Sequence, residues 1–483
     1  AFYVFCKRTF GYWSKKGVKG PNPLPLVGNF GSVILQKQSA NEYVKNVHLK
    51  FKGEKLVGLY RGFQPVILVR DPALIKQVLI KDFHVFQDRG INSSSSRLSD
   101  NLFGAEGETW KILRQKLTPV FTSRKLKDMI PLMHQCVENF LKYVDKLVEH
   151  NIDHEIRSLT AKYTLEVIGS CAFGLDIDSF ADKENEFSVM AKKIFTPTTF
   201  ARFLAILDMI IPGIRKMFTT SQEIQDFFMD LVHTVVKERS GKPPVRKDFM
   251  DLMIELREQG KVSRRKEGGI AEIDFDDYLI AAQALVFYSA GFETSSATMS
   301  FLFHEMALNP EIQNKVYEEI CGIVEKYNGQ INYESIKEMT YLEMVFDETL
   351  RKYSVAGILF RKCLENYKFP GTNVTISKGT PVMISASALN ADTDYFPEPN
   401  KFNPDNFSPE NVKNIPQCVY MPFGEGPRNC IGLRFAKVQS MMGTAAFLQK
   451  FKIEPSSKTT TNLEYDPKGI VLITKGGIWV KIS

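Results

Sequence analysis

The residues Phe275–Leu308 show an uninterrupted pattern typical of one long helix, and this segment constrains the fold more than any other. Asp274 is a suitable N-cap, and Asn309-Pro310 ends the pattern because a residue before proline avoids the helical region. At 1.5 Å per residue the helix would be about 50 Å long, enough to cross a whole domain. The length of 483 residues alone suggests about three domains. A helix of this length favours one large domain instead.

The other periodic segments indicate a fold that is mainly α with a small β region. Helical periodicity dominates residues 105 to 353, whereas strand patterns cluster near the two ends of the chain. The expected strands are Lys55–Tyr60, Pro65–Val69, Lys368–Pro381 and Ile470–Ile482, which together predict a sheet assembled from both ends. The segments Ser240–Asp248, Arg257–Lys266 and Ser456–Asn462 are expected to be surface loops.

Composition excludes several classes of protein. Hydrophobic residues make up 44% and charged residues 24% of the chain, which is typical of a globular protein. A net charge of +7 is too small and too dispersed for a nucleic-acid-binding surface, but it would suit an acidic partner or an anionic membrane. The seven cysteines form no CxxC pair and are odd in number, which argues against a disulfide framework or a zinc ribbon. A cysteine with a chemical role must therefore act alone.

Two apolar segments of the chain raise the question of contact with a membrane. No stretch reaches the ~18 consecutive apolar residues of a span, but the apolar Ala1–Cys6 is followed by basic residues. We predict that residues 1–19 are the remainder of a membrane anchor with a basic linker, and that residues 20–483 form a single domain; a disordered or locally packed terminus is the alternative. The apolar segment Phe203–Ile214, broken by Pro212, is either a core helix or a membrane-dipping lid, and the sequence does not separate these.

A glycine-rich loop around Cys430 is the most informative motif. Phe423–Gly432 contains two glycines and a proline that force a tight loop, and a helical pattern begins at Leu433. Free N–H groups at a helix N-terminus favour a thiolate, and a single thiolate suits a haem iron. An isolated cysteine is more often an inert buried thiol. These ten residues, however, resemble position by position the haem-binding signature of the cytochrome P450 family (Phe, Gly, any, Gly, any, Arg, any, Cys, any, Gly).

A second motif lies in the centre of the long helix. Ala290-Gly291-Phe292-Glu293-Thr294 resembles the oxygen-activation motif of the same family. The Thr294 hydroxyl is expected to bond to the carbonyl of Ala290, four residues earlier, which would make a polar notch in an apolar wall. The resemblance implies that Thr294 and Glu293 are catalytic and direct protons to bound oxygen, while the small Ala290 leaves room beside the haem.

A third motif pairs Glu348 with Arg351. Alone, charges at positions i and i+3 are usually a solvated surface pair. The motif resembles the buried Glu-any-any-Arg brace of the family, to which a nearby Arg usually adds a third partner. Here Asn406 stands in the place of that Arg, and Ser354 follows the brace where Pro is common. We therefore expect a structural brace that is looser than usual.

The resemblance also implies residues around a haem b cofactor, which would lie between the long central helix and the cysteine-loop helix. The residues expected to contact the haem are Trp110, Arg114, Ala290, Arg361, Phe423 and Arg428, with Cys430 as the axial ligand of the iron. The residues expected to contact substrate are Phe103, Val286, Ala290, Ile358, Leu359 and Val471. All six of the latter are apolar, so a lipophilic ligand is expected.

The whole chain is most similar to family-six microsomal enzymes of insects. That resemblance implies a haem-thiolate monooxygenase that inserts one oxygen atom from O2 into lipophilic xenobiotics, plant toxins or insecticides. The implied partners are NADPH–cytochrome P450 reductase, which supplies electrons from NADPH, and cytochrome b5, at the cytoplasmic face of the endoplasmic reticulum membrane. A basic patch could attract the acidic reductase, or it could be only a solvated face: Lys111, Lys116, Arg124, Lys125, Lys127, Arg434 and Lys437.

Two other functions are compatible with a haem thiolate. One is a reductase-independent isomerase, and the other is a non-catalytic protein that binds haem or hydrophobic ligands. The intact Glu293-Thr294 pair argues against both.

Overall fold

The computed structural model describes residues 2–91, 96–150, 152–181, 185–196, 198–211, 213–218, 221–239, 248–266, 268–469 and 471–483. Among them the α-helices are α1 (Phe2–Phe10), α2 (Gly31–Ile34), α3 (Ala40–Lys50), α4 (Pro72–Lys76), α5 (Gly107–Leu117), α6 (Ser123–Val148), α7 (Ile156–Ile168), α8 (Glu186–Phe195), α9 (Thr199–Ile210), α10 (Gln222–Arg239), α11 (Phe249–Glu258), α12 (Asp277–Leu308), α13 (Pro310–Lys326), α14 (Tyr333–Glu338), α15 (Thr340–Lys352), α16 (Ala386–Leu389) and α17 (Leu433–Lys450).

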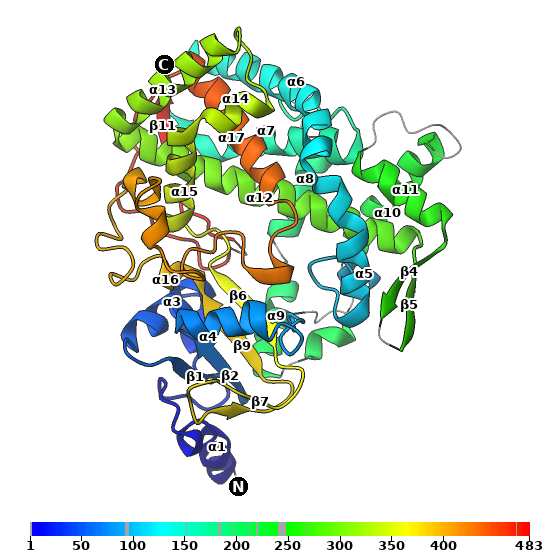
Figure 1. Cartoon of the computed structure of the whole chain (residues 1–483), viewed down its shortest axis with the longest axis vertical. Helices are drawn as coiled ribbons and strands as arrows, with labels where there is room; N and C mark the ends of the chain where they lie inside the picture. The colour runs from blue at the N-terminus through cyan, green and yellow to red at the C-terminus, as the bar shows by residue number, and fades with distance from the viewer. Residues whose placement is uncertain are drawn as a thin grey trace.

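The strands are short. Most lie near the two ends of the chain, as predicted, but His154–Glu155, Lys261–Lys266 and Gly269–Asp274 lie in the middle segment that was predicted to be helical. They are β1 (Leu56–Arg61), β2 (Gln64–Val69), β3 (His154–Glu155), β4 (Lys261–Lys266), β5 (Gly269–Asp274), β6 (Ile358–Lys362), β7 (Tyr367–Lys368), β8 (Thr375–Ile376), β9 (Pro381–Ser385), β10 (Ile453–Pro455) and β11 (Trp479–Ile482). The largest sheet has the order β1-β2-β9-β6, so early and late strands pair as predicted. Figure 1 shows this sheet in one half of the molecule and most helices in the other.

Helix α12 is the axis of the helical half, where α6, α7 and α17 lie around it (Figure 1). It is buried on nearly all sides, which is why its sequence is apolar around the whole helix. Its predicted start was two residues too early. Asp276 is the N-cap and accepts a hydrogen bond from the Leu279 N–H at 3.0 Å, whereas Asp274 ends strand β5 and pairs with Lys261.

Two other predictions about the chain between motifs were wrong. The supposed loop Arg257–Lys266 ends α11 and forms β4, which pairs antiparallel with β5. Only Val262 of β4 is buried, so the charged residues conceal the alternating pattern of the strand. The supposed strand Lys368–Pro381 is instead β7, a turn and β8, followed by the start of β9. Residues 240–247 and Ile470, which lie in other predicted segments, are outside the described residues.

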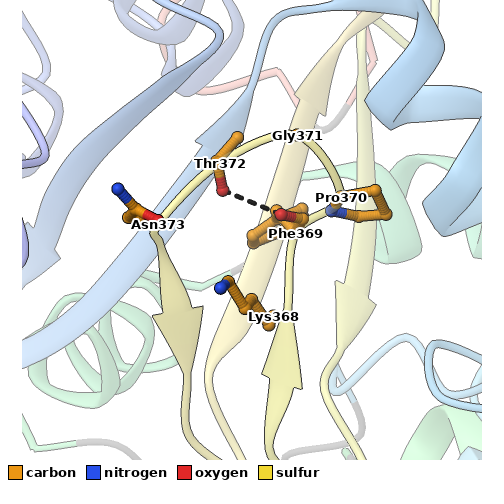
Figure 2. A pocket seen from close by; sticks show the side chains of 6 residues that line it. All are labelled: Lys368, Phe369, Pro370, Gly371, Thr372 and Asn373. Carbon is orange, nitrogen blue, oxygen red and sulfur yellow. Dashed lines mark hydrogen bonds between the residues drawn. The ribbon is translucent and has the colours of Figure 1, made fainter.

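The turn between β7 and β8 holds a shallow depression. Figure 2 shows that Lys368–Asn373 line it, and the Thr372 hydroxyl donates to the Phe369 carbonyl at 2.9 Å. One turn of backbone supplies all six residues, and none of the predicted site residues is among them. This depression is therefore a local feature of the turn between β7 and β8.

The first residues are packed against the sheet. Trp13 is buried, its indole N–H donates to the Leu59 carbonyl at 2.9 Å, and the Gly58 N–H donates to the Lys19 carbonyl. The division at residue 19 stays a prediction, but the backbone there is already bonded to β1. Among the described residues, no helix combines the length and hydropathy that a bilayer-crossing segment needs.

The segment Phe203–Ile214 is not a core helix. It contributes to α9, in which Leu204 is buried while Phe200 and Phe203 are 60% and 56% exposed. Ile211, just after the helix, is also more than half exposed, and Pro212 is outside the described residues. The membrane-dipping or lid interpretation of this segment stays a prediction, with which the exposed side chains are compatible.

Candidate active site

One face of α12 carries the predicted oxygen-activation residues. Val286, Ala290 and Thr294 are spaced four residues apart and therefore share a face, and all three retain accessible surface although most of α12 is buried. The Thr294 hydroxyl donates to the Ala290 carbonyl at 2.8 Å, as predicted. Gly291 has a packing role, because a Cβ at this position would lie 2.5 Å from Cδ1 of Ile168 on α7.

Glu293 lies on a different side of α12 and contacts α7. Its carboxylate is buried and accepts a hydrogen bond from the guanidinium of Arg157. Burial raises the pKa of Glu293, and the charge of Arg157 opposes that rise. No sequence motif marks Arg157, which lies 136 residues away from Glu293. The acid of the motif is thus held by a cation of the neighbouring helix.

The loop that carries Cys430 is tight because glycine permits it. Gly424 and Gly426 have φ of 73° and 74°, a region that residues with a Cβ rarely adopt. At Gly426 a Cβ would lie 2.0 Å from the Leu79 carbonyl oxygen, so this loop packs directly against the turn Gln77–Lys81. The Cys430 N–H donates to the Phe423 carbonyl at 2.8 Å. These contacts fix Cys430 three residues before α17.

Cys430 differs from the other cysteines in its surroundings. It is the one exposed cysteine in the described part of the chain, whereas Cys363 and Cys418 are buried and have pKa values raised to about 11. Although its side chain is accessible, the dense protein around it reduces solvation of a thiolate and so raises the pKa of Cys430; the Gly432 N–H and the cations Arg114 and Arg89 oppose this rise. The expectation that the helix terminus alone favours a thiolate was therefore incomplete. A bound cation such as iron would supply the missing stabilisation.

Two buried arginines beside the cysteine loop have unsatisfied donors. Arg361 and Arg428 are 3% and 2% exposed, and Nε of both and Nη1 of Arg428 have no hydrogen-bond partner among the described residues. Burial lowers the pKa of each to about 9, and the charge of Arg89 contributes. Buried guanidinium groups with open donors need an anion. The carboxylates of a haem fit this need, so the residues present are suited to that cofactor.

Trp110 and Arg114 meet the loop from helix α5. The Arg428 guanidinium lies over the Trp110 ring, 4.6 Å from its centroid. Both terminal nitrogens of Arg114 donate to Asn429, one to its carbonyl and one to its side chain, each at 2.8 Å. The two predicted haem contacts of α5 are therefore brought to the cysteine loop.

Arg89 is a further cation of this site that sequence reasoning missed. It donates to the carbonyls of Phe103 at 2.8 Å and Arg428 at 3.2 Å, and its guanidinium lies 4.3 Å from the centroid of the Phe103 ring. Burial lowers its pKa to about 10. No motif marks Arg89 in the sequence, because it reaches the site only through the fold.

Three further predicted substrate contacts, Ile358, Leu359 and Val471, lie outside α12, and one of the three is placed near the cysteine loop. Leu359 lies near the cysteine loop, since a Cβ at Gly424 would be 3.9 Å from its Cδ2. Ile358 precedes it in β6, so its side chain points to the opposite face of the sheet, where it packs against the apolar cluster that includes Val57 and Met383. Val471 packs against the large helical core, and contact of these residues with a substrate stays a prediction.

The Glu348–Arg351 brace is completely buried. Arg351 Nε and Nη2 donate to the two carboxylate oxygens of Glu348, each at 2.7 Å. The remaining donors reach the carbonyls of Asn390, Pro399 and Lys401. All five N–H groups of Arg351 thus have partners.

The two departures from the family pattern take part in this brace. Asn406 donates its side-chain amide to Glu348 Oε2 at 3.2 Å, so it bonds where an arginine would add a charge. The Ser354 hydroxyl accepts from the side chain of Asn390, whose carbonyl holds Arg351. Looseness of the brace stays a prediction, which the Discussion makes testable.

The fold and these side chains together define a haem-thiolate protein, with one cysteine for the iron and cations for its carboxylates. Comparison with known proteins agrees. The sequence profile "Cytochrome P450" matches residues 18–480. Cytochrome P450 6B7 of Helicoverpa armigera is 42% identical over 99% of this chain and 95% of that relative. Cytochrome P450 6B1 of Papilio polyxenes is 42% identical over 99% and 96%, and cytochrome P450 6a2 of Drosophila melanogaster is 38% identical over the same shares. The chain belongs to the cytochrome P450 family and is a haem-dependent monooxygenase.

Proposed function

We propose that this monooxygenase inserts one oxygen atom into lipophilic small molecules, including plant toxins, insecticides and other xenobiotics, with electrons that a reductase takes from NADPH. The observation that carries the proposal is that two buried arginines with open donors interact beside the loop of Cys430: Arg428, which belongs to that loop, and Arg361. The apolar face of Val286 and Ala290 supports a lipophilic substrate, because it offers few polar partners.

Each residue of the site has a role that follows from its contacts. A haem b bound through Cys430 would supply the iron chemistry that activates O2. Arg361 and Arg428 would hold its carboxylates, and Ala290 leaves space on α12. The Thr294 hydroxyl would relay protons from the protein interior to bound oxygen. Its hydrogen bond to the Ala290 carbonyl fixes the orientation of this hydroxyl. Glu293 can supply protons after its contact with Arg157 opens.

The proposed reductase would dock at the cysteine side, but with fewer free cations than the sequence suggested. Lys111 pairs with Glu108 at 2.7 Å, and Lys127 pairs with Glu334 at 2.6 Å. Lys437 pairs with Glu343 at 2.5 Å. Arg124 and Arg434 are exposed and can attract an acidic surface. Cytochrome b5 would use the same surface.

The proposed location is the cytoplasmic face of the endoplasmic reticulum membrane. Exposed apolar side chains on and after α9 support it, since Phe200 contacts Phe218 and both remain accessible. Asp208 of α9 interacts electrostatically with Arg61 at the end of β1, and α1 contacts the adjacent turn through Phe5 and Phe63. This apolar surface could therefore enter a membrane together with α1.

A substrate panel tests the proposal. The purified protein is incubated with NADPH, a microsomal reductase and lipophilic plant compounds, and products are identified by mass. The proposal expects NADPH consumption and a mass gain of one oxygen. Rearranged products without NADPH consumption would show an isomerase, and binding without any product would show a ligand-binding protein.

A further inference from the structure

The carbonyl oxygens around the Glu293–Thr294 pair are almost all bonded to side chains. From Ala290 to Ser296 the donors are Thr294 to Ala290, Gln439 to Gly291, Thr164 to Phe292, Ser296 to Glu293, Thr298 to Thr294 and Thr160 to Ser296. Side-chain bonds of this kind bend a helix and weaken its own ladder. The shape of this turn of α12 is therefore set partly by other helices.

Gln439 is the one donor in this set that comes from the cysteine helix. It lies nine residues after Cys430 on α17, is fully buried, and donates its side-chain amide to the Gly291 carbonyl at 3.0 Å. Its own backbone carbonyl accepts from the Tyr163 hydroxyl of α7 at 2.9 Å. Tyr163 also packs on Gly443, where a Cβ would lie 2.5 Å from its ring. Gln439 thus stands where α7, α12 and α17 meet.

The contact of Gln439 changes what Ser295 can do. Ser289, Thr294, Thr298 and Ser300 of α12 each bond to the carbonyl four residues earlier. Ser295 would reach Gly291 in the same way, but the Gly291 carbonyl accepts from Gln439 instead. The Ser295 hydroxyl and Oε1 of Gln439 are both buried, and neither has a partner in the part of the chain that the structure describes.

We propose that Gln439 is a positioning residue for the acid–threonine pair. It ties the turn of α12 that carries Glu293 and Thr294 to the helix that follows Cys430. Together with Ser295 it seats one internal water, which satisfies the two open polar atoms. The inference rests on the proposed roles of Glu293 and Thr294. When this turn is held in place, proton transfer through Glu293 and Thr294 is faster than the release of hydrogen peroxide. The reduced oxygen then enters the product.

Electron coupling measures this role directly. Product formation and peroxide release each use two electrons per O2, so their ratio at equal NADPH consumption reports how well the turn is positioned. For Gln439→Leu we expect that ratio to fall about tenfold, the size of effect that small displacements of catalytic groups produce. Haem content and the absorbance band of the reduced, carbon monoxide-bound protein should be retained.

The variant Gln439→Glu gives a readout that a purely structural residue would not. A protonated Glu can donate to the Gly291 carbonyl, whereas the ionised form cannot. Coupling in this variant should be close to normal at low pH and fall as pH rises through the pKa of the new carboxyl, which burial raises. The unchanged protein should show no such step. Ser295→Ala, which removes one partner of the water, should uncouple in the same direction but less.

Two controls separate the explanations. Gln313 is also a buried glutamine that bonds to an α12 carbonyl, that of Met306 at 3.2 Å, but at the far end of the helix. Gln313→Leu should lower stability without changing the ratio of product to peroxide. Thr294→Ala should release peroxide; if it does not, the proposed role of Thr294 in proton transfer is wrong, whereas the proposed function itself fails only if the unchanged protein forms no oxygenated product. If Thr294→Ala uncouples while Gln439→Leu, Gln439→Glu and Ser295→Ala leave the ratio unchanged at every pH, the positioning role is overturned.

Discussion

The molecule contains two sets of buried arginines that differ in how they are satisfied. Arg351 has partners for all five donors and a carboxylate at 2.7 Å, so the protein itself neutralises it. Arg361 and Arg428 are as deeply buried but keep open donors. Burial lowers the pKa of both, the charge of Arg89 adds to this at each, and the charge of Arg361 adds to it at Arg428. A buried charge that the chain neutralises belongs to the fold, whereas one left open belongs to a ligand.

The largest effect should come from breaking the satisfied set. Glu348→Ala leaves Arg351 buried without its carboxylate, which typically costs about 3–5 kcal/mol. The free energy of urea unfolding should fall by that amount. The surface pair Glu398–Lys401 has the same spacing, and Glu398→Ala should cost less than about 0.5 kcal/mol. Equal losses for the two variants would refute the view that the brace is distinguished by burial.

Glu166 is an acidic counterpart of the open arginines. It is buried on α7 and accepts from Asn139 and Ser179, but burial still raises its pKa from 4.5 to about 7. The folded state thus prefers the protonated acid. The contribution of Glu166 to the free energy of unfolding is fully present below pH 4.5 and is lost as pH rises through about 7.

A substitution checks this linkage. Glu166→Gln mimics the protonated acid, so it should be as stable as the unchanged protein at about pH 4 and more stable by at most about 3 kcal/mol above pH 8. Thermal melts at the two pH values measure the difference. A stability gain that is the same at both would contradict the raised pKa.

Removing one of the arginines with open donors should not lower the stability of the haem-free protein, in contrast to breaking the Glu348–Arg351 brace. Arg428→Met removes a buried charge, so the protein without haem should keep or gain stability. Its affinity for added haem should fall about 10- to 100-fold, because one charge-assisted contact is worth about 1.5–3 kcal/mol. Arg434→Met, on the exposed side of α17, is the matched control and should change neither quantity. Loss of stability in haem-free Arg428→Met would make Arg428 a structural residue.

The smallest effect concerns Asn406, the uncharged member of the brace. Asn406→Arg would add a cation beside Glu348, which Asn406 now reaches at 3.2 Å. We expect this variant to retain haem to a higher temperature, with a gain of about 1 kcal/mol. Unchanged haem retention on heating would show that the brace is not loose.

The sequence predicts the residues within the motifs of this site better than the residues that contact those motifs in the folded protein. Cys430, Thr294 and Glu348 lie in local patterns whose spacing reflects a loop or a helix, and the structure places each where its pattern indicates. Arg89, Arg157 and Gln439 lie in no local pattern. They meet the site through contacts between residues more than a hundred positions apart, such as Gln439 and Gly291, which are 148 apart.

The errors in the fold have a similar origin. Strand β4 was missed because only Val262 faces the core, and charged residues fill the remaining positions. The start of α12 was misplaced because Asp274 and Asp276 are both good N-caps, and only the pairing of β5 decides between them. Local patterns identify elements that bury a regular apolar face, such as α12, whereas tertiary pairing decides where elements end and reveals strands such as β4 that bury almost nothing.

The central claim is that Cys430 alone holds a haem iron as a thiolate. The reduced, carbon monoxide-bound absorbance spectrum tests it most directly, because thiolate ligation gives a band of its own. The unchanged protein and Cys418→Ser, a buried cysteine of the same segment, should both show the thiolate band. Cys430→Ser should lose it. A thiolate band that survives Cys430→Ser, or that disappears in Cys418→Ser with the fold intact, would contradict this account.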